Sequence, residues 1–129
     1  MRCPALALAA AGLLAGCDTI DLEAVSEPPP TKRARIHGDD RDIDLSRGVA
    51  LAVECVDTCD GPCRGARVRS SDEAVVEVRK AYHFAGVARG ESEEHNAATF
   101  VLLGISPGSA KVTVESDCTD DGYDVTVGP

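Results

Sequence analysis

Along most of this chain, apolar and polar residues alternate with a period of two, a pattern that predicts β-strands rather than helices. From about residue 36 onward, the short alternating runs are separated by turn-forming residues, and the strongly apolar run 98–105 ends at Pro107-Gly108. We therefore expect about seven short strands in an all-β, antiparallel sandwich. The alternating apolar positions are Ile43 and Leu45, then Val49, Leu51, Val53 and Cys55, then Val68, Val76 and Val78, then Ala110, Val112 and Val114, and finally Tyr123, Val125 and Val127.

The start of the chain has a different pattern. Residues 5–15 are apolar or glycine and follow the single positive charge of Arg2. This run is too short for a bilayer core, which needs about 20 residues, but it fits the apolar region of a secretory signal. The residues Leu14-Ala15-Gly16-Cys17, which close the run, resemble the lipobox of bacterial lipoprotein signal peptides. The resemblance implies cleavage between Gly16 and Cys17, with a diacylglycerol and an acyl chain carried by Cys17. A secretory peptide that is cut elsewhere is the alternative.

These patterns predict three parts: a lipoprotein signal peptide at 1–16, a lipidated, proline-rich linker at 17–35, and a β-sandwich domain at 36–129. Residues 18–35 show no sustained periodicity, and Pro28-Pro29-Pro30 favours a stiff polyproline II spacer. Such a disordered tether would hold the domain off the membrane. The predicted location is the bacterial cell envelope, on the extracytoplasmic side of the inner or outer membrane.

Composition narrows the class of partner. The formal net charge is −9, and loss of Arg2 with the leader makes it more negative. An acidic surface argues against binding to nucleic acid and against electrostatic attraction to anionic lipid. Aromatic residues make up 3% of the chain, with no tryptophan, so the core is thin for the length. Small exported domains commonly compensate with disulfides.

Three motifs resemble those of the bacterial Ig-like domains of group 2. They are the turn Leu45-Ser46-Arg47-Gly48, the Ser-Ser-Asp-x-x-Val element at residues 70–78, and the Pro-Gly-x-Ala-x-Val-x-Val element at residues 107–114. The resemblance covers roughly residues 36–128 and implies an immunoglobulin-like sandwich that acts as a non-catalytic binding, adhesive or scaffolding unit. Its partner would be a protein or polysaccharide of the envelope. The chain departs from the family in its long segment 81–96, and in lacking the tryptophan that often precedes the Ser-Ser pair.

Apart from Cys3 in the leader and Cys17, four cysteines remain. In an immunoglobulin-like sandwich the second and sixth strands run in the same direction on opposite sheets, and Cys55 and Cys118 continue the inward faces of those strands. We predict a Cys55–Cys118 bond between the sheets and a Cys59–Cys63 bond around a small loop. On the loop-entropy model, the Cys55–Cys118 bond would stabilise the fold by about 4 kcal/mol and the Cys59–Cys63 bond by about 2 kcal/mol. Four cysteines allow three pairings, so the other two stay open.

A metal or cluster site is the competing interpretation of these cysteines. A zinc site would more usually show pairs of cysteines two residues apart, and export to an oxidising compartment favours disulfides. Oxygen ligands for calcium are present in two acidic clusters, for which solvated turns are the plainer explanation. The weak calcium candidates are Asp117, Asp120, Asp121 and Asp124, and the second cluster is Asp39, Asp40, Asp42 and Asp44.

No sequence pattern predicts catalysis. His37, His83 and His95 are scattered, and the chain has no Gly-x-Ser-x-Gly nucleophile motif and no phosphate-binding loop. We therefore predict no catalytic residues and no cofactor beyond the lipid on Cys17. The alternative function is a small ligand- or calcium-binding lipoprotein that uses the aspartate clusters or the 81–96 segment.

Overall fold

The computed structural model describes residues 19–25, 32–57, 61–81, 97–117 and 119–129, which form ten strands. In chain order these are β1 (Ile20–Ala24), β2 (Ala34–His37), β3 (Asp42–Ser46), β4 (Ala50–Asp57), β5 (Gly61–Pro62), β6 (Arg67–Ser70), β7 (Val76–Lys80), β8 (Thr99–Gly104), β9 (Gly108–Glu115) and β10 (Asp120–Gly128).

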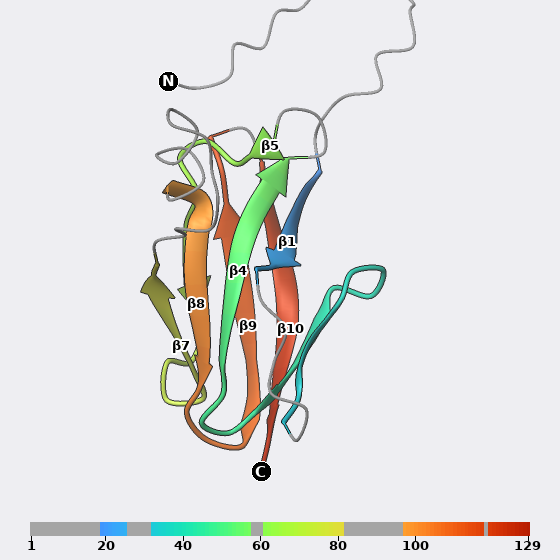
Figure 1. The fold of residues 1–129 in the computed structure, drawn as a ribbon, viewed down its shortest axis with the longest axis vertical. Helices are drawn as coiled ribbons and strands as arrows, with labels where there is room; N and C mark the ends of the chain where they lie inside the picture. The colour runs from blue at the N-terminus through green and yellow to red at the C-terminus, as the bar shows by residue number, and fades with distance from the viewer. Residues whose placement is uncertain (1–18, 26–31, 58–60, 82–96, 118) are drawn as a thin grey trace, which may run out of the picture.

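The strands form two sheets that face each other across the core (Figure 1). The first has the order β1-β4-β8-β7, with the short β5 beside β4, and the second has the order β2-β3-β10-β9-β6. These orders match the ABED and CFG sheets of the constant-type immunoglobulin sandwich, with β2 and β3 added beside the last strand. The predicted all-β sandwich is therefore confirmed. One pair of strands departs from the antiparallel pattern, because β3 pairs with β10 in parallel.

The core consists of the inward residues of both sheets, as the period of two predicts. Leu51, Val53 and Cys55 on β4 are at most 1% exposed, and Val112 on β9 and Val125 on β10 face them with the same degree of burial. Valine, leucine and isoleucine suit this pleated surface because their branched side chains interdigitate well. The register of each strand is fixed by this burial, since a slip of one residue would turn the apolar face toward solvent.

Two of the motifs have the turn geometry that their residues predict. The Asp72 amide donates to Ser70 Oγ at 3.2 Å and the Ala74 amide to Asp72 Oδ1 at 3.0 Å, so short polar side chains shape the turn before β7. In the other motif, Gly48 has a φ of 76° and donates its amide to the Gly104 carbonyl at 2.8 Å. Glycine suits position 48 because this left-handed backbone conformation is strained for residues that have a side chain.

The domain begins earlier than the sequence predicted. Residues 20–24, assigned to the linker, form β1, which pairs with β4 from Ile20↔Asp57 to Ala24↔Val53. β2 likewise begins at Ala34, inside the same predicted linker. The pattern was missed because β1 is short and only Ile20 and Leu22 alternate into the core. The linker prediction 17–35 and the domain boundary at residue 36 are therefore corrected: the fold starts at Ile20.

Within the described ranges of the chain, no helix is long and apolar enough to cross a membrane.

Candidate functional site

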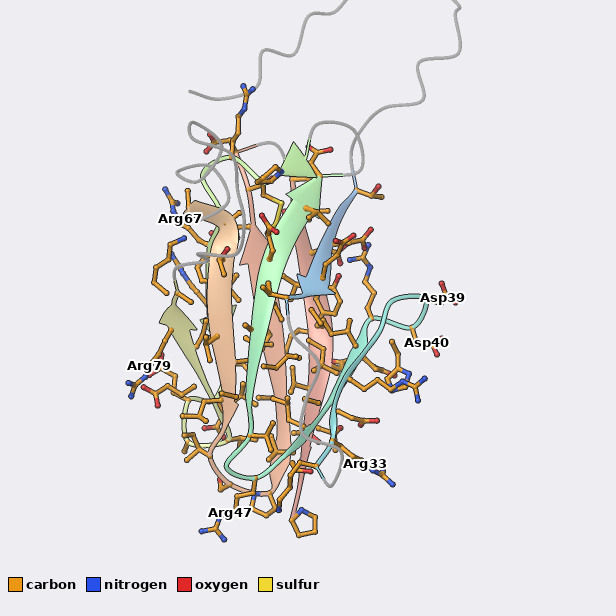
Figure 2. The ribbon with its side chains drawn as sticks, in the orientation of Figure 1. Arg33, Asp39, Asp40, Arg47, Arg67 and Arg79 are labelled. Carbon is orange, nitrogen blue, oxygen red and sulfur yellow. A yellow bond between two sulfur atoms is a disulfide. The ribbon has the colours of Figure 1, made fainter. Side chains whose placement is uncertain are left out.

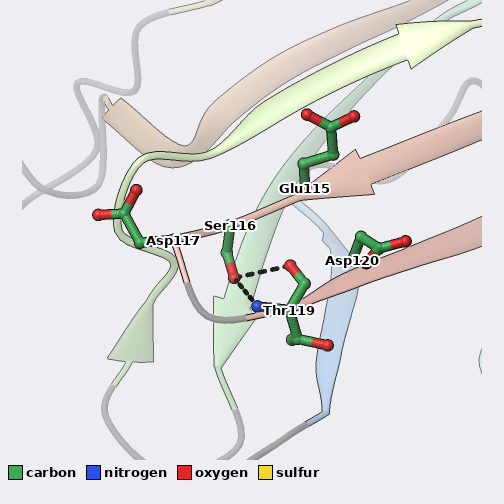
Figure 3. A pocket seen from close by; sticks show the side chains of 5 residues that line it. All are labelled: Glu115, Ser116, Asp117, Thr119 and Asp120. Carbon is green, nitrogen blue, oxygen red and sulfur yellow. Dashed lines mark hydrogen bonds between the residues drawn. The ribbon is translucent and has the colours of Figure 1, made fainter. Parts of the chain in front are cut away.

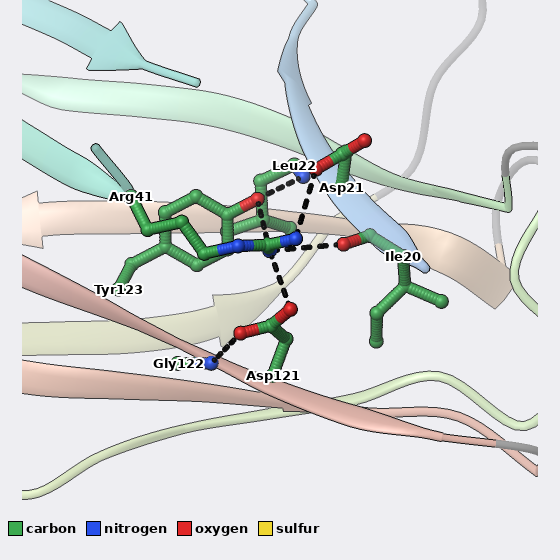
Figure 4. Close-up of polar contacts among 7 residues, drawn as sticks. All are labelled: Ile20, Asp21, Leu22, Arg41, Asp121, Gly122 and Tyr123. Atoms are coloured by element: carbon green, nitrogen blue, oxygen red, sulfur yellow. Dashed lines mark hydrogen bonds and ion pairs between the residues drawn. The ribbon is translucent and has the colours of Figure 1, made fainter. Parts of the chain in front are cut away.

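Arg41, at the end of the turn between β2 and β3, joins strands of the two sheets (Figure 4). Its Nη1 donates to the Ile20 carbonyl oxygen at 3.1 Å and to the Tyr123 hydroxyl oxygen at 3.3 Å. Ion pairs run from Nη1 to Asp121 Oδ2 at 2.7 Å and from Nη2 to Asp21 Oδ1 at 3.4 Å. The guanidinium also lies 5.4 Å from the centroid of the Tyr123 ring. We call these five residues the Arg41 cluster.

Tyr123 is a buried member of the Arg41 cluster, 1% exposed. Its hydroxyl oxygen accepts a hydrogen bond from the Leu22 amide at 2.8 Å. Burial raises the pKa of the Tyr123 phenol, while the Leu22 hydrogen bond and the Arg41 charge act in the opposite direction. The phenol is therefore neutral at physiological pH and satisfies a backbone amide of β1 that would otherwise be buried without a partner.

The backbone of Arg41 is itself unusual. Its φ is 54°, a left-handed conformation that is uncommon for a residue with a side chain, and its carbonyl accepts from the Asp124 amide at 2.9 Å. This conformation ends the β2–β3 turn and lets the side chain reach β1 and β10. This role of Arg41 was not predicted from the sequence, in which Asp39, Asp40, Asp42 and Asp44 stand out as an acidic cluster. The available signal was one arginine set among aspartates.

The disulfide in the described part of the chain joins Cys55 to Cys63, with an S–S distance of 2.02 Å and a Cα–Cα distance of 5.4 Å. The predicted pairing of Cys55 with Cys118 and of Cys59 with Cys63 is therefore wrong. Cys55 does face inward as predicted, but β5 folds back antiparallel on the end of β4 and brings Cys63 alongside it. The Cys63 amide also donates to the Cys55 carbonyl at 2.9 Å. The bond is therefore a local one, between residues eight apart in the sequence.

The turn between β9 and β10 borders an open hollow of about 440 Å³ (Figure 3). The Ser116 hydroxyl closes this turn, donating to the Thr119 carbonyl at 2.9 Å and accepting from the Thr119 amide at 3.1 Å. The hollow has an acidic rim, and the Ser116 hydroxyl on that rim is engaged with the Thr119 backbone. Its lining residues are Glu115, Ser116, Asp117, Thr119 and Asp120.

The structure separates the four calcium candidates. Asp121 is bound to Arg41 within the cluster, whereas Asp124 lies 3.8 Å from Lys111 Nζ. Asp117 donates its amide to the Arg64 carbonyl at 2.9 Å, which places it beside the chain that leads into β6. In the described ranges, no group of three or more histidine, cysteine, aspartate or glutamate side chains is arranged to hold a metal ion. This holds for Asp120 as well.

The second acidic cluster does not converge either. Asp39 and Asp40 are exposed at the tip of the β2–β3 turn (Figure 2), and Asp44 lies 3.2 Å from His37 Nε2. Another hollow of about 400 Å³ lies where β2 begins and where β3 and β10 end, and it includes Ser46, which is bonded to the Arg33 backbone. The lipidation candidate Cys17, the cysteines Cys59 and Cys118, and the histidines His83 and His95 lie outside the described residues, as does nearly all of the 81–96 segment.

No protein-family model matches the chain, and no curated protein matches it either. Among solved structures, the chain is similar to domains of the S-layer protein SbsC. Domains 4 and 5 align with a TM-score of 0.46 at 18% identity over 80% of this chain and 54% of that one. A structure of domains 4–9 gives a TM-score of 0.49 at 15% identity, over 86% of this chain and 14% of the other. At these levels the likeness concerns strand architecture and does not bear on function.

Proposed function

We propose that this chain is a lipid-anchored module of the bacterial cell envelope, held to the membrane through Cys17, with a non-catalytic binding or scaffolding role. The observation that carries the proposal is the lipobox-like Leu14-Ala15-Gly16-Cys17 at the end of an apolar run led by Arg2. A protein or polysaccharide of the envelope is the proposed partner, and nucleic acid is not expected because the chain is acidic.

The folded domain supports an exported location. The Cys55–Cys63 disulfide is typical of oxidising compartments, where such bonds form and persist. The core relies on aliphatic side chains, with only Tyr123 and Phe100 as buried aromatics among the described residues, so a covalent link is a useful supplement. The serines that border the two hollows use their hydroxyls on the backbone: Ser116 bonds to Thr119, and Ser46 accepts from the Arg33 amide. This favours binding over catalysis for the described surface.

Intact-mass measurement of the protein from a bacterial host tests the anchor. The mature chain should begin at Cys17 and carry the mass of a diacylglycerol and an acyl chain, and it should partition into the detergent phase. Cys17→Ser should lose the lipid and its membrane association. Cys3→Ser is the matched control, because Cys3 belongs to the leader and its replacement should leave the mature product unchanged. A mature chain that begins elsewhere without lipid would overturn the proposal.

A further inference from the structure

The proposed anchor lies very close to the first strand. Only Asp18 and Thr19 separate Cys17 from Ile20, where β1 begins. Three peptide units span at most about 10 Å when fully extended. The proline segment 28–30 follows β1 in the sequence and therefore cannot act as a spacer between the lipid and the sandwich.

β1 is firmly part of the fold. Ile20 is 1% exposed and Leu22 is 4% exposed, and the strand pairs with β4 along its whole length. The Arg41 cluster adds contacts to the Ile20 carbonyl and to Asp21 that fasten the strand to β10 in the other sheet. A strand buried and bonded in this way does not peel off to lengthen the tether, because its release would expose two core side chains.

The direction of β1 decides which end of the sandwich faces the anchor. Ile20 pairs with Asp57, the last residue of β4, so the anchor lies at the upper end of Figure 1. The β9–β10 turn is at the same end, beside Arg64. At the lower end the Arg47 amide donates to the Gly128 carbonyl next to the C-terminus. The nine residues of β10 alone extend about 30 Å between these ends.

From this arrangement we infer that the lipidated protein stands end-on at the membrane. The upper end, marked by Ile20, Asp57, Arg64 and the β9–β10 turn, meets the lipid headgroups, and the lower end, around Arg47 and Pro129, is presented to an envelope partner. This inference rests on the proposed lipidation of Cys17. It reassigns the β9–β10 hollow to the membrane side and leaves the lower end as the surface that a partner reaches first.

The sides of the sandwich offer little to hold it flat on a bilayer. Among the described residues Ile105 is the one large apolar side chain that is exposed, at 37%, and it lies at the lower end. Binding in the interface plane needs a broad apolar face or a basic cluster.

The edge formed by β6 and β7 is the competing contact, because it carries several arginines (Figure 2). Their charge is partly engaged within the protein. Arg79 Nη2 is 2.7 Å from Glu77 Oε1, and Arg67 lies opposite Glu115 in the β6–β9 ladder. Lys80 is turned over the Phe100 ring, 4.1 Å from its centroid, and bonds to the Ala97 carbonyl. This edge therefore attracts anionic lipid more weakly than the number of its arginines indicates.

The absence of tryptophan allows a direct test, since a single introduced tryptophan is then the sole indole fluorophore. The lipidated full-length variants Arg64→Trp, Arg79→Trp and Arg47→Trp place it at the upper end, at mid-height and at the lower end, each at an exposed arginine. They are reconstituted in phosphatidylethanolamine–phosphatidylglycerol vesicles that contain a headgroup-nitroxide lipid. We expect quenching to be several-fold stronger for Arg64→Trp than for Arg47→Trp, with Arg79→Trp between them.

Inserting a long Gly-Ser spacer between Asp18 and Thr19 is the matched control, and it should abolish the gradient because a flexible linker frees the domain. Equal quenching at all three sites, or the strongest quenching at Arg79, would overturn the end-on inference while intact mass still showed lipid on Cys17. Absence of lipid would instead contradict the proposed function. If a variant fails to fold by circular dichroism, Arg67→Trp and Arg33→Trp form a second pair at opposite ends (Figure 2).

Discussion

The Cys55–Cys63 disulfide and the Arg41 cluster stabilise the same half of the sandwich by different means. The disulfide joins residues eight apart in the sequence and closes a short loop after β4. The Arg41 cluster joins residues that are 20 and 82 apart, with no covalent bond, and connects the two sheets. The covalent link therefore restricts local chain entropy, whereas the non-covalent cluster secures the overall arrangement of the first strand.

Stability should depend most strongly on the packing of β1 beneath the Arg41 cluster. Leu22→Ala should lower the free energy of unfolding by about 2–5 kcal/mol, because it removes buried methyl groups and leaves a cavity. Chemical denaturation followed by circular dichroism measures this loss. Glu23→Ala is the control, since Glu23 is exposed on the same strand and its change should stay within about 0.5 kcal/mol. Similar losses in both variants would show that β1 is not packed as described.

Removing the disulfide should have the next largest effect on the free energy of unfolding. The double variant Cys55→Ala with Cys63→Ala should lose about 2.5 kcal/mol on the loop-entropy account of a closure of eight residues. Loss of the cross-link should lower the denaturant concentration at the midpoint of unfolding, without changing the strand content of the folded protein. A loss near the figure for the long closure would point to a bond that spans the sheets instead.

A non-reducing peptide map separates the pairings directly. We expect one linked fragment pair containing Cys55 and Cys63, and we expect the fragments with Cys59 and Cys118 to be joined as the remaining pair. Both of these cysteines lie outside the described residues, so their link is a prediction from elimination. Recovery of Cys55 attached to Cys118 would refute the structural assignment.

Breaking the Arg41 cluster should have a smaller effect than the disulfide. Arg41→Ala should cost about 1–2 kcal/mol, because the lost bonds are charge-assisted but partly exposed to water. Arg47→Ala, an exposed arginine at the opposite end, should change stability little. A double-mutant cycle of Arg41→Ala with Asp121→Asn isolates the 2.7 Å ion pair, and additivity of the two changes would show that the pair contributes nothing.

The smallest effect concerns pH. Because burial raises the pKa of Tyr123, the unfolded chain releases the phenol proton at lower pH than the folded chain does. The contribution of Tyr123 to stability is thus fully present below about pH 10, the ordinary tyrosine value, and is lost as the pH rises through the folded pKa. The variant Tyr82→Phe leaves Tyr123 as the sole tyrosine, so phenolate absorbance reports its titration alone. A midpoint at the ordinary value would contradict its burial.

Much of the fold could be predicted from local patterning. The period of two located the inward faces of β3, β4, β9 and β10, since alternate residues of a strand necessarily point to one side. The Ser70–Asp72 turn could likewise be predicted from the sequence, because short polar side chains bond to the nearby backbone. β1 could not be predicted in this way. Two inward residues are too few to show the period of two, and the partner strand β4 is distant in the sequence.

The all-β class, the strand faces, the acidic composition and the lipobox-like start follow from the amino-acid order alone, because each depends on neighbouring residues or on composition. The pairing of Cys55 with Cys63, the bridge that Arg41 makes between β1 and β10, and the first strand at Ile20 become visible only in the folded chain. These features are contacts or strand pairings whose choice depends on which segments meet in space. A cysteine, an arginine or a short apolar pair has several energetically similar partners until the topology selects one, and that selection is a property of the whole chain.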